Sequence, residues 1–118
     1  MESKNRIKDN EEFKRLYKKS KRYHNRDYRI LVANNEFNFP RFGFTITKKF
    51  GKANKRNKMR RKLKEIVRLN LDKFENKDYI ITPKYHTVDY DYKELESSLL
   101  HLMNIIKKGK KWISLWCF

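Results

Sequence analysis

The sequence predicts an α+β sandwich in which helices pack on a small mixed sheet, with the element order α-β-β-β-α-β-α. Apolar residues recur at helical spacing in three segments, 11–19, 54–74 and 91–108. The segments between them are short and rich in aromatic and β-branched residues, which favours strands. A strand on each side of the helix at 54–74 predicts a parallel pair, whose crossover would by the usual rule be right-handed.

The chain is expected to form a single domain. Its 118 residues suit one domain, and no Gly/Pro/Ser-rich linker or internal repeat divides them. Hydrophobic residues make up 38% and aromatic residues 14%, which is enough for one modest core and argues against a disordered chain.

Each predicted helix carries one apolar face. In the first, Phe13, Leu16 and Tyr17 fall at i, i+3 and i+4, and Asp9 or Asn10 can cap its N-terminus. The buried stripe of the second has one polar member and comprises Met59, Leu63, Ile66, Val67, Asn70 and Phe74. The inward residues of the third are Tyr92, Leu95, Leu99, Leu102, Met103 and Ile106. Gly109 is expected to cap its C-terminus.

The predicted strands lie at 20–24, 27–34, 41–48 and 78–82. The third of them alternates, with Phe42, Phe44 and Ile46 on one face and Gly43, Thr45 and Thr47 on the other. Because this second face carries only small side chains, it leaves room for a ligand to lie across the sheet.

The charge of the chain is large and concentrated. Its formal net charge is +17, from 31 basic and 14 acidic residues. Residues 48–68 contain eleven basic residues and one acid, Glu65, so more than half of the excess lies in this segment. Such an excess opposes compaction by self-repulsion, and a polyanionic partner is its natural explanation.

Several classes of protein are not expected. No run of about 20 apolar residues predicts a membrane span, and the polar N-terminus does not resemble a secretory signal, so a cytoplasmic location is the default. The single Cys117 and three scattered histidines predict no metal site. Asp89 and Asp91 precede a helix and could simply be capping groups, so no catalytic residue is expected. No small-molecule substrate is expected either.

The basic segment places a row of cations on one helix. Arg56, Arg60 and Lys64 are spaced i, i+4 and i+8, which makes a row about 12 Å long. Aligned cations repel one another on an isolated helix, but they suit a row of phosphates. The alternative is a solvated helix face, although such faces normally mix both signs of charge. Glu65, the single acid of the segment, is expected to form an ion pair within the helix.

Phe13 and Tyr17 have two possible roles. Beside the small face of strand 41–48, with basic residues nearby, they could form a stacking platform for single-stranded nucleic acid. The helical spacing alone favours plain core packing for both rings.

The run KKFGKANKRNKMRRKLKE resembles the signature of the bacterial ribonuclease P protein component. That signature is a Lys-Lys-x-Gly-x-Ala segment leading into a basic helix. Here the residues are Lys48, Lys49, Gly51 and Ala53, followed by Arg56, Asn57, Lys58, Arg60, Arg61 and Lys64. The resemblance covers about residues 4–108 and leaves 109–118 as a tail.

The resemblance implies a function as well as a fold. The fold would be the same sandwich, but with an unusual left-handed crossover. The protein would join a catalytic RNA to form ribonuclease P, an endonuclease that removes the 5′ leader of precursor tRNA during tRNA maturation. The RNA subunit would perform the hydrolysis with bound Mg²⁺, which agrees with the expectation of no protein active site.

The resemblance also assigns roles to residues. The catalytic RNA would be contacted by Lys55, Arg56, Asn57, Lys58, Arg60, Arg61, Lys64 and Arg68. The leader would be contacted by Phe13, Tyr17, Thr45, Thr47, Lys48 and Lys49. For Phe13 and Tyr17 the resemblance outweighs the core-packing alternative. Leu31 stands where many relatives have a tyrosine, so leader contact there would be weaker.

Two rival functions remain open at this point. A small basic ribosomal protein, or another structural RNA-binding protein, would share the composition. A metal-dependent nuclease acting alone would need a carboxylate or histidine cluster.

In the tail, Trp112, Trp116 and Phe118 could pack on the sheet, contact RNA or fray.

Overall fold

The computed structural model describes residues 5–7 and 10–116, and within that range the side chains of 5–7 and 11–108. The helices are α1 (Asn10–Lys19), α2 (Ala53–Leu69) and α3 (Tyr92–Trp116). The strands are β1 (Lys21–His24), β2 (Tyr28–Asn34), β3 (Arg41–Phe44) and β4 (Lys77–Pro83). Short 3₁₀ turns lie at η2 (Lys48–Phe50), η3 (Leu71–Lys73) and η4 (Tyr85–Asp89). The predicted order of helices and strands is therefore confirmed.

The four strands form one mixed sheet in the order β1-β2-β4-β3. β1 and β4 both run antiparallel to β2, whereas β3 and β4 are parallel, with Gly43 opposite Ile80. The predicted parallel pair around α2 is thus present. The hand of its crossover stays a prediction of the family resemblance.

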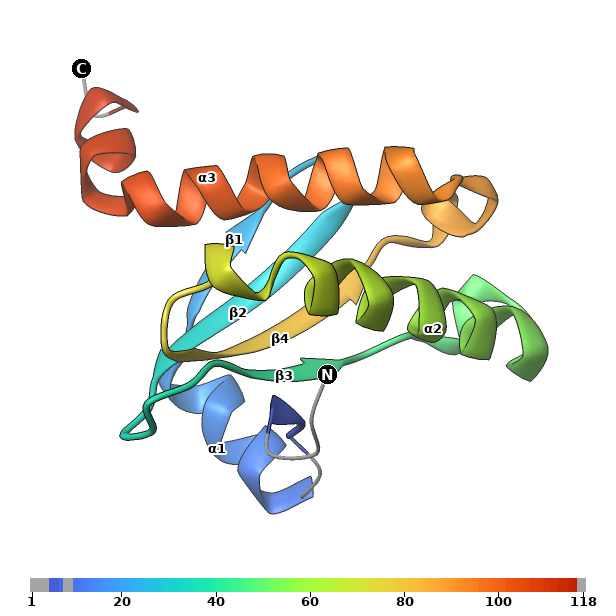
Figure 1. Ribbon diagram of the computed structural model, residues 1–118, viewed down its shortest axis with the longest axis horizontal. Helices are drawn as coiled ribbons and strands as arrows, with labels where there is room; N and C mark the ends of the chain where they lie inside the picture. The colour runs from blue at the N-terminus through green and yellow to red at the C-terminus, as the bar shows by residue number, and fades with distance from the viewer. Residues whose placement is uncertain (1–4, 8–9, 117–118) are drawn as a thin grey trace.

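The sheet lies between α2 and α3 on one face and α1 on the other (Figure 1), and it separates two apolar clusters. On one face α2 and α3 cover the larger cluster, which includes Tyr28, Ile30, Phe42 and Ile81. On the opposite face α1 and the segment before it cover a smaller cluster of Ile7, Leu16, Leu31, Ala33 and Ile80. Side chains alternate between the two clusters along the central strands β2 and β4, as strands buried on both faces require.

The second helix ends earlier than expected. The predicted helix ran to Phe74, but α2 ends at Leu69, and Asn70 adopts φ −117° and ψ 22°. The Asn70 side-chain amide donates to the carbonyl of Ile66 at 2.8 Å, which satisfies one of the last helical carbonyls. All six residues of the predicted stripe are nevertheless buried, because η3 carries Phe74 back onto the core.

The predicted strand 41–48 is also too long, since β3 ends at Phe44. Thr45 still donates to the carbonyl of Ile81 at 3.0 Å, and the chain then turns into η2. The alternation holds through this turn, because Phe42, Phe44 and Ile46 all pack with the larger cluster.

The expectation that Gly109 ends the last helix is wrong, because α3 continues through it to Trp116. A glycine costs a helix interior only about 1 kcal/mol, so it does not oblige the helix to stop. The side chains of Trp112 and Trp116 and the whole of Cys117 and Phe118 lie outside the described residues, as does the capping role of Asp9 or Asn10.

Candidate nucleic-acid interface

The outward side of α2 is densely cationic. Met59, Leu63, Ile66 and Val67 are buried, so the residues between them point away from the core. All eight residues predicted to contact RNA are exposed or half-buried, and the helix contains a single acid, Glu65. The amphipathic pattern that fixes the buried stripe therefore also brings the cations onto one side.

The row of Arg56, Arg60 and Lys64 is half-buried rather than fully solvated. The Nε of Arg56 is buried and has no hydrogen-bond partner among the described residues. Arg60 donates from Nη1 to the Oδ1 of Asn57 at 2.9 Å. Burial lowers the pKa of Lys64 below its ordinary value, and the charges of Arg6 and Arg60 lower it further. In this row, the Nε of Arg56 lacks a hydrogen-bond partner among the described residues and Lys64 lies in the field of Arg60. A bound anion would accept from the first group and offset the charge of the others.

Arg68 differs from the rest of the cationic helix. Its Nε donates to Oε2 of Glu65 at 3.1 Å, and its Nη2 contacts the other carboxylate oxygen. The expected pairing of Glu65 within the helix is confirmed. Arg68 therefore already shares its charge with a carboxylate of its own helix.

Phe13 and Tyr17 lie on the opposite face of the sheet, where α1 crosses β3. The Phe13 ring fills the space above Gly43, where an added Cβ would lie 2.5 Å from Cζ. Tyr17 is 44% exposed, and its hydroxyl lies 3.3 Å from Oγ1 of Thr45. Phe13 thus packs against the protein itself, whereas Tyr17 offers an accessible ring.

The remaining predicted leader residues follow β3. Thr47, Lys48 and Lys49 are exposed on the turn that ends this strand. Gly51 then takes a φ of 134°, a conformation that favours glycine, and leads the chain into α2. One continuous segment therefore links the α1 face of the sheet to the cationic helix.

Leu31 belongs to the core beneath α1. It is 4% exposed and packs with Leu16, Ala33 and Ile80. This position of β2 therefore offers no exposed side chain on which a base could stack.

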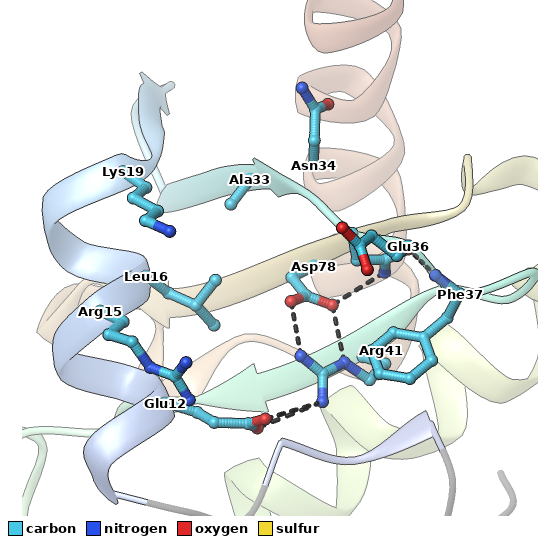
Figure 2. Close-up of a pocket in the computed structure, with 11 residues that line it drawn as sticks. Glu12, Arg15, Leu16, Lys19, Ala33, Asn34, Glu36, Phe37, Arg41 and Asp78 are labelled. Atoms are coloured by element: carbon cyan, nitrogen blue, oxygen red, sulfur yellow. Dashed lines mark hydrogen bonds and ion pairs between the residues drawn. The ribbon is translucent and has the colours of Figure 1, made fainter.

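An ion-pair clamp that the sequence analysis missed fixes α1 on the sheet (Figure 2). Arg41 binds Asp78 through two parallel hydrogen bonds, from Nε at 2.8 Å and from Nη2 at 2.7 Å. Its Nη1 also reaches Oε2 of Glu12 on α1 at 3.1 Å, and its guanidinium lies 4.6 Å from the centre of the Phe37 ring. Arg41 continues the alternation of Gly43 and Thr45, so its side of the sheet could have been predicted, but its partners could not.

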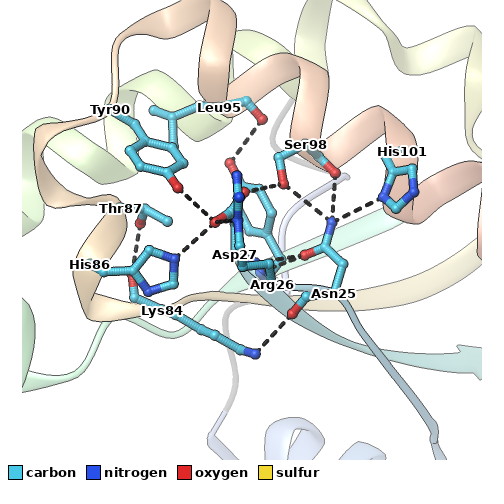
Figure 3. Close-up of polar contacts among 11 residues, drawn as sticks. Asn25, Arg26, Asp27, Lys84, His86, Thr87, Tyr90, Leu95, Ser98 and His101 are labelled. Carbon is cyan, nitrogen blue, oxygen red and sulfur yellow. Dashed lines mark hydrogen bonds and ion pairs between the residues drawn. The ribbon is translucent and has the colours of Figure 1, made fainter.

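A buried carboxylate, Asp27, joins three segments at the other end of the sheet (Figure 3). It accepts hydrogen bonds from Ser98 Oγ at 2.7 Å, His86 Nε2 at 2.8 Å and Tyr90 OH at 2.9 Å. Burial alone would raise its pKa, but these hydrogen bonds outweigh burial and hold the pKa well below its usual range. This network was also missed, and its buried acid is fully engaged rather than free to act as a base.

Within 5–7 and 10–116, no group of three His, Cys, Asp or Glu residues is placed to hold a metal ion. Asp91 accepts from the backbone N–H of Glu94 at 2.8 Å and so caps α3 as expected, while Asp89 is exposed in η4. None of the described helices combines the length and apolar character needed to cross a bilayer.

The fold and this surface define a class of small, basic α+β proteins that carry a cationic helix beside an aromatic-bearing sheet face. The family model named Ribonuclease P matches residues 1–107, and the chain belongs to the family of bacterial ribonuclease P protein components. Members of this family are the protein part of the ribonucleoprotein enzyme ribonuclease P.

Individual relatives agree with this assignment. The ribonuclease P protein component of Finegoldia magna is 47% identical over 98 residues, covering 82% of this chain and 86% of the relative. That of Alkaliphilus oremlandii is 42% identical, covering 92% and 99%. A solved structure of a Staphylococcus aureus RNase P protein mutant matches with a TM-score of 0.85 at 32% identity, covering 91% of this chain and 92% of that one.

Proposed function

We propose that this chain binds the catalytic RNA of ribonuclease P through α2 and the 5′ leader of precursor tRNA through the α1 face of the sheet. The observation that carries the proposal is the half-buried row Arg56–Arg60–Lys64, which has no carboxylate partner among the described residues. Arginine and lysine donors in such a row match the spacing and charge of RNA phosphates.

The leader would cross the side of the sheet that α1 leaves accessible. Tyr17 would stack on one base, while Thr45 and the exposed Thr47 lie along the same track. Lys48 and Lys49 would bind the phosphates where the track meets α2. Phe13 would support this surface by its position on Gly43, rather than by stacking along its whole face.

The side chains that this protein offers suit RNA binding, and hydrolysis would be left to the RNA subunit. Its best-placed side chains are cations and hydroxyls, and the buried acids Asp27 and Asp78 are engaged in hydrogen bonds. Mg²⁺, held mainly by the RNA subunit, would supply the activated water for hydrolysis. The protein would bind and orient the RNA strands and screen their repulsion, which lowers the Mg²⁺ concentration that cleavage needs. A cytoplasmic location fits this role in tRNA maturation.

Cleavage of a precursor tRNA tests the proposal directly. A bacterial ribonuclease P RNA is assayed at low Mg²⁺ with and without this chain, and we expect the chain to accelerate removal of the leader. Failure to stimulate, together with tight binding to ribosomal RNA, would favour a ribosomal protein instead. Leader removal by the chain without any RNA subunit would favour a protein nuclease.

A further inference from the structure

The segment before α1 is anchored on both sides of one arginine. Asn5 is 2% exposed and donates from Nδ2 to the carbonyl of Pro40 at 2.7 Å. Ile7 is 6% exposed, and its backbone N–H donates to the carbonyl of Phe42 at 2.8 Å. Arg6 itself is exposed and forms a parallel bridge with Phe42, so its backbone is held along the free edge of β3.

Arg6 and two residues of the helix row, Arg60 and Lys64, line one cavity. A cavity of about 300 Å³ is lined by Arg6, Arg60 and Lys64 together with Phe13, Gly43 and Phe44. An adjoining cavity of about 340 Å³ shares Arg6 and Lys64 and extends to Arg61, Glu65 and Arg68. The first cavity therefore lies between the helix expected to bind the catalytic RNA and the ring expected to support the leader.

The charges in the first cavity are unbalanced. Among the described residues, no carboxylate pairs with Arg6, Arg60 or Lys64, and Glu65 in the adjoining cavity is bound to Arg68. Burial and the two neighbouring arginines lower the pKa of Lys64, as expected for cations that face one another without a counterion. Three cations from two separate segments therefore line one cavity, and Lys64 feels the charges of both arginines.

We propose that Arg6, Arg60 and Lys64 form a binding pocket for one RNA phosphate, and that Arg6 belongs to the RNA interface. The inference deepens the proposed function on which it rests, because it adds a residue from the N-terminal segment to a specific site. A tetrahedral phosphate can accept hydrogen bonds from several cations at once, and it would remove their mutual repulsion. The apolar wall of Phe13 and Phe44 would partly shield these bonds from water, which strengthens them.

Inorganic phosphate provides the first test on the full chain alone. We expect phosphate to bind the unaltered protein, and Arg6→Gln and Lys64→Met each to weaken its Kd about tenfold, as for one lost charged hydrogen bond. Arg22→Gln is the matched control, because Arg22 is exposed on β1 at the opposite edge of the sheet. Equal weakening by Arg22→Gln, or none by Arg6→Gln, would mean diffuse charge rather than a pocket. Arg6→Lys should restore part of the affinity, and circular dichroism verifies that each variant is folded.

The assembled enzyme provides the second test and identifies the source of the phosphate. Arg6→Gln is compared with the unaltered chain for affinity to the catalytic RNA, and for affinity of the complex to tRNA substrates with and without a leader. A loss confined to leader-bearing substrate would assign the pocket to the leader, whereas weaker assembly would assign it to the catalytic RNA. Stimulation of cleavage by the unaltered chain with no effect of Arg6→Gln in either assay would overturn the pocket and leave the proposed function standing.

Discussion

Phe13 lies directly on Gly43, and a Cβ at Gly43 would stand 2.5 Å from Cζ and 2.8 Å from Cε1 of the ring. The room that the small-residue face of β3 provides is therefore used first by the protein's own side chain. One turn further along α1, the hydroxyl of Tyr17 lies 3.3 Å from Oγ1 of Thr45, just after β3, and Tyr17 stays 44% exposed. Of the two rings on this face, Phe13 is half-buried against Gly43 and Tyr17 is the exposed one.

Replacing Gly43 by alanine should displace the Phe13 ring. Overpacking of this kind costs about 1–3 kcal/mol of stability, which urea unfolding would measure. Affinity for leader-bearing tRNA should fall, while affinity for tRNA without a leader should change little. In the double variant Gly43→Ala with Phe13→Leu, the smaller side chain should recover part of the lost stability. Strictly additive losses would show that the two residues do not share this space.

Arg41 should be among the most sensitive positions of the α1 face. Arg41→Met leaves the carboxylate of Asp78, only 3% exposed, without its two guanidinium bonds. Removing one partner of a buried pair costs about 3 kcal/mol, which urea unfolding of the purified chain would detect. The control Arg22→Met removes an exposed arginine and should stay within about 0.5 kcal/mol. A loss at Arg41 no larger than the control would contradict the clamp.

Asp27 should contribute stability that depends on pH. Its pKa lies below the usual value in the folded protein, so its contribution is fully present above the unfolded pKa of about 4. The contribution then falls as pH drops through the range below 4 towards the folded pKa. Asp27→Asn should therefore destabilise the protein by about 2 kcal/mol at pH 7, and this difference should shrink at pH 3.

Urea titrations at the two pH values would measure the Asp27 effect. Asp89→Asn serves as the control, because Asp89 is an exposed acid in η4 and its substitution removes no buried carboxylate. If the Asp27→Asn difference were the same at pH 3 and pH 7, the hydrogen bonds from Ser98, His86 and Tyr90 would not depend on the charge of Asp27.

The sequence predicted the parts of this fold that periodicity encodes. The stripe from Met59 to Phe74 is buried as expected, since helical spacing reports directly which side of a helix meets the core. The end of α2 was misplaced because the stripe continues past Leu69 in residues that are no longer helical. Periodicity identifies the face that is buried, and it does not identify the residue at which the backbone changes.

Contacts between distant segments could not be predicted in this way. Arg41 pairs with Glu12 and Asp78, which are 29 and 37 positions away in the sequence. Asp27 joins residues from η4 and α3, the farthest of them 71 positions away. Arg6 stands in a polar run with a single apolar neighbour, Ile7, and no repeating pattern signals its bridge to Phe42. Each contact depends on the tertiary arrangement, which one sequence does not specify locally.

Arg60 and Arg68 should differ in the salt dependence of RNA binding. Arg60→Ala should weaken assembly with the catalytic RNA and flatten the log–log salt dependence by about one unit for each phosphate that the helix no longer neutralises. Arg68→Ala should change the slope less, because Arg68 is already paired with Glu65. Binding measured at several salt concentrations would separate the two variants. An unchanged slope for Arg60→Ala would exclude Arg60 as a phosphate ligand.

Tyr17 should bind a base of the leader through its ring rather than through its hydroxyl. Tyr17→Phe removes the 3.3 Å contact with Thr45 but keeps the ring, so leader affinity should stay nearly unchanged. Tyr17→Ala removes the ring and should cost about 1–3 kcal/mol in binding leader-bearing tRNA, the usual range for one stacked base. Binding of tRNA without a leader serves as the control and should not respond to either change. Equal losses for the two variants would assign the contact to the hydroxyl instead, because only the hydroxyl is missing from both.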